Sequence, residues 1–360
     1  MPEPLKNAYN EAYILTLISS FTTICETFDS KLFHQLIFDE NWDDRELKDR
    51  MDHIARMIHQ VLNVDYVQAL SILKPVCQDF GGYEAMFFPH YVELYGMEHW
   101  AESIDALEHM TQYSSSEFAV RPFIIKAPKK MMKQMLRWTK HKSHHVRRLS
   151  SEGCRPRLPW AMALPEFKQD PELILPILER LKNDESEYVR RSVANNINDI
   201  AKDNVSIVKD IAGQWLGGSE HTDWIVKHGC RTLLKQADSD ILKLFGYTPV
   251  KSLRISDFTL KKSTIEIGSE LNFSFSLNCK GENLGKLRIE YAIDYMKSNG
   301  KQSRKIFKIS EGDVFGNEKI LSRKQSFKEM STRKHYAGEH CISIIVNGVD
   351  LGGVGFLVKP

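Results

Sequence analysis

The residues best suited to binding or catalysis lie in HHVRRLSSEGCRPRLPW, residues 144–160. A helix over its first part makes Arg148 and Glu152 neighbours, because side chains four residues apart lie on one helical face. Pro156 and Pro159 follow, and proline disfavours helix while fixing the shape of a loop. The run therefore predicts a helix that carries an ion pair and then a rigid loop. The core-facing positions of this helix are expected to be Val146, Leu149 and Gly153.

The predicted loop alternates basic residues with an indole, at Arg155, Arg157 and Trp160. Guanidinium groups suit phosphate recognition, and a rigidly held tryptophan can contact a cation through its π face. With Arg147 and Arg148 just before it, the loop favours a role in nucleic-acid binding. The alternative is an ordinary surface loop in which Trp160 is a packing anchor.

A second helix with polar chemistry is predicted over residues 189–202. Arg191, Asn195 and Asp199 recur at intervals of four and are expected to form one polar stripe that presents a guanidinium, an amide and a carboxylate to a groove. The alternative is a solvated helix face. The apolar positions expected to face the core are Val189, Val193, Ile197 and Ile200.

A third carboxylate, Glu117, stands in the segment SSSEFAVRPFI. Ser114 or Ser115 is expected to cap a helix here, which would place Glu117 in its first turn, where the helix dipole favours an acid. The functional alternative is that Glu117 lies near the same groove as the other two acids.

The charge of the chain is strongly segregated around these residues. Residues 111–160 contain 12 Lys and Arg against 2 Asp and Glu, a net charge of +10, whereas the whole chain carries +2. Such a segment indicates a face that binds a polyanion. Residues 1–110 contain 7 basic against 19 acidic residues and favour a solvated acidic surface.

Several classes of protein are excluded. No apolar run reaches the ~18 residues of a membrane helix, and the opening MPEPLKNAYNEAY is neither a signal nor a transit peptide. The six cysteines have no CxxC spacing and the histidines form no HExxH, so no metal site is expected. Free thiols in a reducing cytoplasm are expected instead.

The elements that must position these residues are helices up to about residue 248. Apolar residues at helical spacing predict helices over 11–28, 45–62 and 66–80. Four Val–basic pairs, beginning at Val120, Val146, Val189 and Val226, form a degenerate internal repeat. Stacked repeats of this kind build an α-solenoid with a groove for an extended partner. The alternative is an ordinary helical bundle.

After residue 250 the apolar period changes to two, as in LNFSFSLN over 271–278. About seven short strands predict a β-sandwich. Pro249 marks the expected boundary, which divides the chain into a helical domain over 1–250 and a sandwich over 251–360. Cys279 and Cys341 fall in strands and could form an inter-sheet disulfide, but reduced core thiols are favoured.

Three of these motifs, taken in order, resemble the AlkC branch of the HEAT-like-repeat DNA glycosylases, which are relatives of AlkD. They are SSSEFAVRPFI, the 144–160 run with its RPRLPW ending, and VRRSVANNINDIAKD. The C-terminal strands resemble the immunoglobulin-like domain of one AlkC subgroup. The fold implied is a HEAT-like α-solenoid followed by an immunoglobulin-like β-sandwich.

The resemblance implies a monofunctional glycosylase that removes alkylated bases such as 3-methyladenine and 3-methylcytosine and leaves an abasic site. It implies no metal and no organic cofactor. It implies the active-site acids Glu117, Glu152 and Asp199, the aromatic Trp160 and the DNA-contacting Arg148. The partner is double-stranded DNA, and the protein is expected to be a cytoplasmic monomer, associated with the bacterial nucleoid when bound to DNA. The rival function is a non-catalytic HEAT-repeat scaffold or DNA-binding module, which would gain nothing from three acids in its groove.

Overall fold

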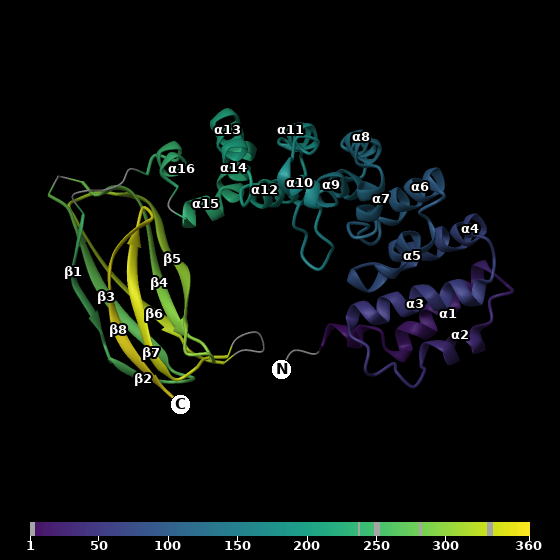
Figure 1. Cartoon of the computed structure of the whole chain (residues 1–360), viewed down its shortest axis with the longest axis horizontal. Helices are drawn as coiled ribbons and strands as arrows, with labels where there is room; N and C mark the ends of the chain where they lie inside the picture. Colours follow the sequence, from purple (N-terminus) through teal and green to yellow (C-terminus); the bar gives the residue numbers. More distant parts are fainter. Residues whose placement is uncertain (1–3, 237, 248–252, 281–282, 330–333) are drawn as a thin grey trace. The chain divides into compact units, whose positions relative to one another are not determined.

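The computed structural model describes residues 4–236, 238–247, 253–280, 283–329 and 334–360. The chain forms two compact units, Pro2–Gly229 and Cys230–Pro360. The first is helical, and the second holds all the described strands together with two short helices (Figure 1). The expected order, helices and then strands, is confirmed.

The helical unit follows the apolar periodicity of its sequence. The helices predicted over 45–62 and 66–80 form at Leu47–Leu62 and Tyr66–Val76. The first ends where Asn63 adopts a left-handed conformation (φ 46°), which asparagine tolerates better than most residues. Three short 3-10 helices are η1 (Leu5–Ala8), η2 (Cys77–Asp79) and η3 (Tyr83–Ala85). The α-helices are α1 (Glu11–Ile24), α2 (Ser30–Ile37), α3 (Leu47–Leu62), α4 (Tyr66–Val76), α5 (Phe87–Tyr95), α6 (Trp100–Met110), α7 (Val120–Lys126), α8 (Pro128–Trp138), α9 (His144–Glu152), α10 (Pro165–Gln169), α11 (Leu175–Leu181), α12 (Glu187–Ile200), α13 (Val205–Trp215) and α14 (Glu220–Gly229).

Helices in this unit contact partners that are close in chain order. Helix α9 contacts α8, α11 and α12, and α12 in turn contacts α13 and α14. Figure 1 shows α7 to α14 following one another in sequence order. Neighbour-to-neighbour packing is what stacked repeats require, while the HEAT period itself stays a prediction. Among the described helices, none is long and apolar enough to cross a bilayer.

The second unit contains a three-stranded sheet in the order β1-β3-β6 and a five-stranded sheet in the order β2-β8-β7-β4-β5. The three-residue strand β2 pairs in parallel with β8, and it is too short to be recognised from the sequence. Two short helices, α15 (Arg231–Lys235) and α16 (Ser239–Leu244), precede the strands. The strands are β1 (Arg254–Leu260), β2 (Thr264–Glu266), β3 (Glu270–Asn278), β4 (Gly285–Met296), β5 (Gln302–Val314), β6 (Glu318–Ser326), β7 (Gly338–Val346) and β8 (Val349–Lys359).

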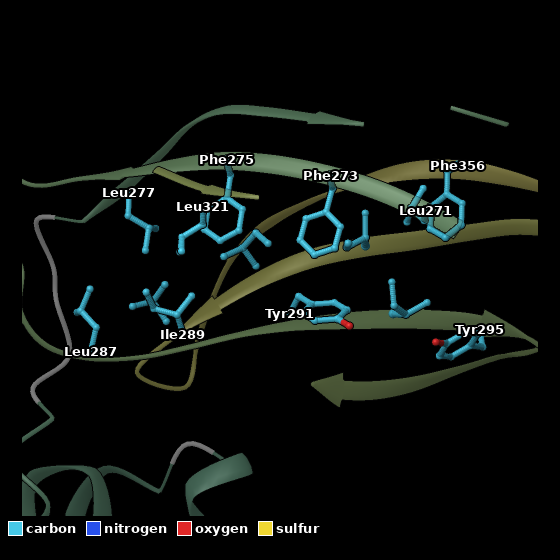
Figure 2. Close-up of a cluster of buried hydrophobic side chains, with 14 of the residues drawn as sticks. Leu271, Phe273, Phe275, Leu277, Leu287, Ile289, Tyr291, Tyr295, Leu321 and Phe356 are labelled. Carbon is cyan, nitrogen blue, oxygen red and sulfur yellow. The ribbon is translucent and has the colours of Figure 1, made fainter. Parts of the chain in front are cut away.

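The core of the sandwich comes from alternate residues of β3 and β4. Leu271, Phe273, Phe275 and Leu277 are buried, as their period of two predicts. Figure 2 shows them facing side chains of β4, among them Ile289 and Tyr291. A core packed between two sheets stabilises the unit because it removes aromatic and aliphatic surface from water.

The cysteines and the domain boundary of this unit differ in part from what the sequence predicts. Cys279 and Cys341 form no disulfide, as favoured; both are only partly buried, and Cys279 packs against the core of the sandwich. The boundary predicted at Pro249 falls on residues 248–252, which lie outside the described residues. Helices α15 and α16, expected to belong to the helical domain, group instead with the sandwich.

Candidate functional site

Helix α9 places Arg148 and Glu152 as its sequence predicts. Arg148 Nη2 lies 3.3 Å from Glu152 Oε1, one turn along. The helix approaches α7 and α8 closely at Gly153, where a Cβ would stand 2.6 Å from Val120 Cγ2 and 3.0 Å from Met135 Cε. Glycine is needed here because a side chain would push the end of α9 away from its neighbours.

Glu117 joins this pair from the turn before α7. Its Oε2 accepts hydrogen bonds from Arg148 Nη1 and from Ser115 Oγ, the latter at 2.7 Å. The expected capping role is wrong, because α7 begins at Val120 with no side-chain cap, and Ser114 Oγ instead donates to the carbonyl of Gly82. Glu117 is therefore bound to a cation and does not serve as a first-turn acid.

Arg155 extends the contacts to Asp199. Its Nη1 donates to Glu152 Oε1 at 2.6 Å, and its Nε donates to Asp199 Oδ2 at 2.8 Å. The second oxygen of Asp199 accepts from Lys202 Nζ at 3.0 Å. Three carboxylates and two guanidiniums thus alternate in one continuous cluster. We call Glu117, Arg148, Glu152, Arg155 and Asp199 the carboxylate–arginine cluster.

The position of two of these acids is unfavourable for helix stability. Glu152 is the last residue of α9, and Asp199 stands in the last turn of α12. The negative end of a helix dipole disfavours a carboxylate at such positions. Burial alone would raise the pKa of Glu152, but Arg148 and Arg155 outweigh it and hold the pKa below its ordinary value. The two arginines therefore keep the buried Glu152 ionised.

The loop after α9 is tied down by the buried Arg121 of α7. Its Nε donates to the carbonyl of Met162 at 2.6 Å, and its Nη1 donates to the carbonyls of Gly153 and Arg155 at 2.9 and 3.0 Å. Burial lowers the pKa of Arg121 to about 10, so the guanidinium is still charged at neutral pH. One side chain thus fixes both ends of the loop.

Trp160 lies in this loop, which extends away from α9 and α10 in Figure 1. The residue is 62% exposed, and its φ of 64° lies in the left-handed region. Lys48 Nζ donates to its carbonyl oxygen at 2.9 Å. The packing-anchor interpretation is wrong, since an anchor would be buried. Residues held in strained backbone conformations cluster at functional sites.

The single polar stripe predicted on α12 does not form. Asp199 is only 2% exposed and belongs to the cluster, whereas Arg191 is exposed and pairs with Glu187 at 2.5 Å. Each step of four residues turns a helix by about 40° beyond a full circle, so Arg191 and Asp199 point in directions roughly 80° apart. Asn195, between them, is half-buried. The DNA-binding roles predicted for Arg191 and Asn195 stay predictions.

Two other predicted DNA-binding arginines are held by acids. Arg147 is buried and donates twice to Asp184, at 2.6 and 3.0 Å. Arg157 donates to both carboxylate oxygens of Asp203, with distances of 2.7 to 3.1 Å. Bidentate pairs of this type fix orientation strongly. Phosphate binding by either residue would have to compete with its acid.

A pocket of about 340 Å³ opens beside the Glu117 end of the cluster. Sequence spacing does not predict this pocket, because its aromatic walls come from segments distant in the chain: Tyr83, Tyr113 and Tyr188. Its full lining is Gly82, Tyr83, Met86, Thr111, Tyr113, Ser114, Ser115, Glu117, His145, Arg148 and Tyr188. Within the described residues, no group of three His, Cys, Asp or Glu side chains is arranged to hold a metal ion.

Known proteins share this architecture. Residues 254–360 match the family described as the C-terminal Ig-like domain of the uncharacterised protein YhaZ. YhaZ of Bacillus subtilis strain 168 is 48% identical over 345 residues, which cover 96% of each protein. The Pseudomonas fluorescens alkylpurine DNA glycosylase AlkC, in a structure bound to DNA containing an abasic-site analogue, is 35% identical. That likeness covers 99% of this chain and 100% of AlkC with a TM-score of 0.95. Both likenesses span the helical unit and the sandwich.

Proposed function

Because the chain belongs to the family of AlkC and YhaZ, we propose that it is a DNA glycosylase that removes alkylated, cationic bases from duplex DNA. The bond hydrolysed is the N-glycosidic bond between base and deoxyribose, and the products are a free base and an abasic site. The substrates are bases such as 3-methyladenine and 3-methylcytosine. The protein acts as a monomer, in the cytoplasm and on nucleoid DNA.

The observation that carries this proposal is the carboxylate–arginine cluster. A base alkylated on a ring nitrogen already bears positive charge, so it leaves without strong protonation. The activation free energy that remains comes mainly from the positive charge that develops on the sugar as the bond breaks. Preorganised carboxylates stabilise such charge and orient the attacking water. The basic segment 111–160 supplies Glu117 and Glu152, and Arg155 joins them to Asp199 of α12. Three acids gathered in this way suit a cationic ligand, because they would repel the phosphates of DNA.

Within the cluster, we assign the main catalytic role to Asp199 and supporting roles to Glu152 and Glu117. Arg155 orients both Glu152 and Asp199 through the hydrogen bonds described above. Trp160 offers its exposed ring to the lesion, where a cation–π contact contributes ~0.5–2 kcal/mol. Exposed lysines of the basic segment supply phosphate contacts, which give binding that weakens as salt rises.

The direct test is release of free base from duplex DNA treated with a methylating agent. Wild-type protein should release 3-methyladenine and 3-methylcytosine, resolved by chromatography, and leave alkali-labile abasic sites. Unmethylated DNA of the same sequence is the control. Binding of both DNAs without release of any base would favour the non-catalytic DNA-binding module instead.

A further inference from the structure

The guanidinium of Arg148 occupies a place that is built for a cation. It donates to Glu117 Oε2, lies 3.3 Å from Glu152 Oε1, and its Cζ stands 5.0 Å from the centre of the Tyr188 ring. A carboxylate on each side and an aromatic face form the arrangement that recognises organic cations. We call Glu117, Glu152 and Tyr188 the cation cradle.

Resting on the function proposed above, we propose that the cation cradle is the binding subsite for the alkylated base, and that Arg148 fills it until a cationic base displaces it. Arg148 is thereby a stand-in for the substrate. The pocket of about 340 Å³ adjoins the cradle and is lined by Glu117, Arg148 and Tyr188, which gives a base room to approach.

Charge balance makes this exchange selective. The three carboxylates of the cluster are balanced by Arg148, Arg155 and Lys202. When a cationic base replaces Arg148, the balance is kept. When a neutral base does so, two nearly buried carboxylates lose a partner, and breaking a buried ion pair in this way is strongly unfavourable. We expect discrimination of ~100-fold or more against the unalkylated base.

The remaining walls of the pocket do not oppose a cation. Burial lowers the pKa of His145, and His144 and Arg148 lower it further, so its imidazole is neutral at neutral pH. Tyr83 and Tyr113 add aromatic surface. DNA favours the exchange as well, because a phosphate can accept the released guanidinium. Arg148 thus contacts DNA only after it has left the cradle.

The test uses the full-length chain and two nucleosides, 3-methylcytidine, which is cationic, and cytidine, which is neutral. Arg148→Met empties the cradle of its charge, and titration calorimetry should show 3-methylcytidine binding at least ~10-fold more tightly than to wild type, with no gain for cytidine. The matched control is Arg56→Met, which removes an exposed arginine of α3 that pairs with Asp52. This control should bind as wild type does.

A second substitution tests the cradle itself. Adding Glu117→Gln to Arg148→Met restores charge balance without a ligand, so the gain for 3-methylcytidine should disappear. If Arg148→Met does not fold, Arg148→Lys is used, because the compact ammonium cannot pair with both carboxylates as the planar guanidinium does. This variant should show a smaller gain in 3-methylcytidine affinity.

Equal binding of the two nucleosides by these variants, or no gain over Arg56→Met, overturns the inference. The outcome is separable from the proposed function. If the wild-type protein releases base but no variant binds 3-methylcytidine more tightly, only the exchange of Arg148 for the base is refuted. A gain in a chain that releases no base from methylated DNA supports the cradle and refutes the glycosylase.

Discussion

Each of the two units buries a network of alternating charge among its described residues, and the two networks have different origins. In the sandwich, Arg288 Nη2 lies 2.6 Å from Glu290 Oε1 and Arg288 Nη1 lies 3.4 Å from Glu311 Oε2. Arg288 and Glu311 are direct partners in the β4–β5 register, as are Glu290 and Lys308. Strand pairing alone therefore brings these charges together.

The carboxylate–arginine cluster has no such explanation. Its members come from the turn before α7, from α9, from the following loop and from α12. Two of its acids stand at helix ends that disfavour them. The contrast teaches that buried charge is not by itself the mark of an active site. A better mark of an active site is a buried charge that stands where the helix dipole disfavours it and that lies beside an open pocket.

The substitution with the largest expected effect is Asp199→Asn. The amide keeps the size of the side chain but removes the charge that stabilises the sugar, so single-turnover base release should fall ~1,000-fold or more. DNA affinity should change little or improve. Glu152→Gln should show a weaker form of the same defect. Near-wild-type excision by Asp199→Asn would remove it from the catalytic role.

The counterpart in the sandwich is Glu290→Gln. The substitution removes the negative charge that pairs with the buried Arg288. The free energy of unfolding, measured by urea titration, should therefore fall by about 3 kcal/mol. Excision per folded molecule should stay unchanged. A loss of excision without a loss of stability would mean that the sandwich network serves the reaction, and the contrast would fail.

An intermediate effect is expected at Arg121, which holds the loop by three carbonyls. Arg121→Lys keeps the charge but not the fork, so the loop shifts, and misplacement by ~1 Å can cost ~100-fold in rate. We expect kcat to fall ~10- to 100-fold with little change in KM for methylated DNA. Arg121→Met should be worse than Arg121→Lys. Equal effects on kcat and KM would point to general loosening of the fold.

The smallest effect concerns pH. Glu152 has a pKa below its ordinary 4.5 in the folded chain. Its ionised form therefore adds stability that is complete above 4.5 and is lost as pH falls through the lowered folded-state pKa. Thermal unfolding from pH 7 to pH 3 should show a steeper loss for wild type than for Glu152→Gln. Parallel curves would show that Glu152 adds no such stability.

Most of the fold follows from apolar spacing, because buried faces need a period of 3.6 in helices and of 2 in strands. The inward set of β3 and the Arg148–Glu152 pair were predictable for that reason. The Arg155–Asp199 contact was not, since it joins residues 44 apart through a loop whose shape depends on Arg121. The pocket walls at Tyr83 and Tyr188 were missed for the same reason.

The local predictions that were wrong have two causes. Ser114 and Ser115 have the right chemistry for a helix cap, yet tertiary partners, the carbonyl of Gly82 and the guanidinium of Arg148, bind them instead. The stripe of Arg191 and Asp199 was a spacing argument extended beyond one helical turn. Sequence thus predicts well which residues share a face within one or two helical turns, and poorly what longer spacings or the packing of several elements select.

The left-handed backbone at Trp160 has an evolutionary consequence. Glycine adopts that conformation at no steric cost and asparagine tolerates it, whereas a bulky residue such as tryptophan is strained there. Substitution of Trp160 by glycine would therefore relieve strain while removing the exposed ring. Selection for a more stable protein and selection for a working one act in opposite directions at this position. A chain in this lineage that had lost its DNA substrate would be expected to drift toward glycine or asparagine here before its buried cluster decayed.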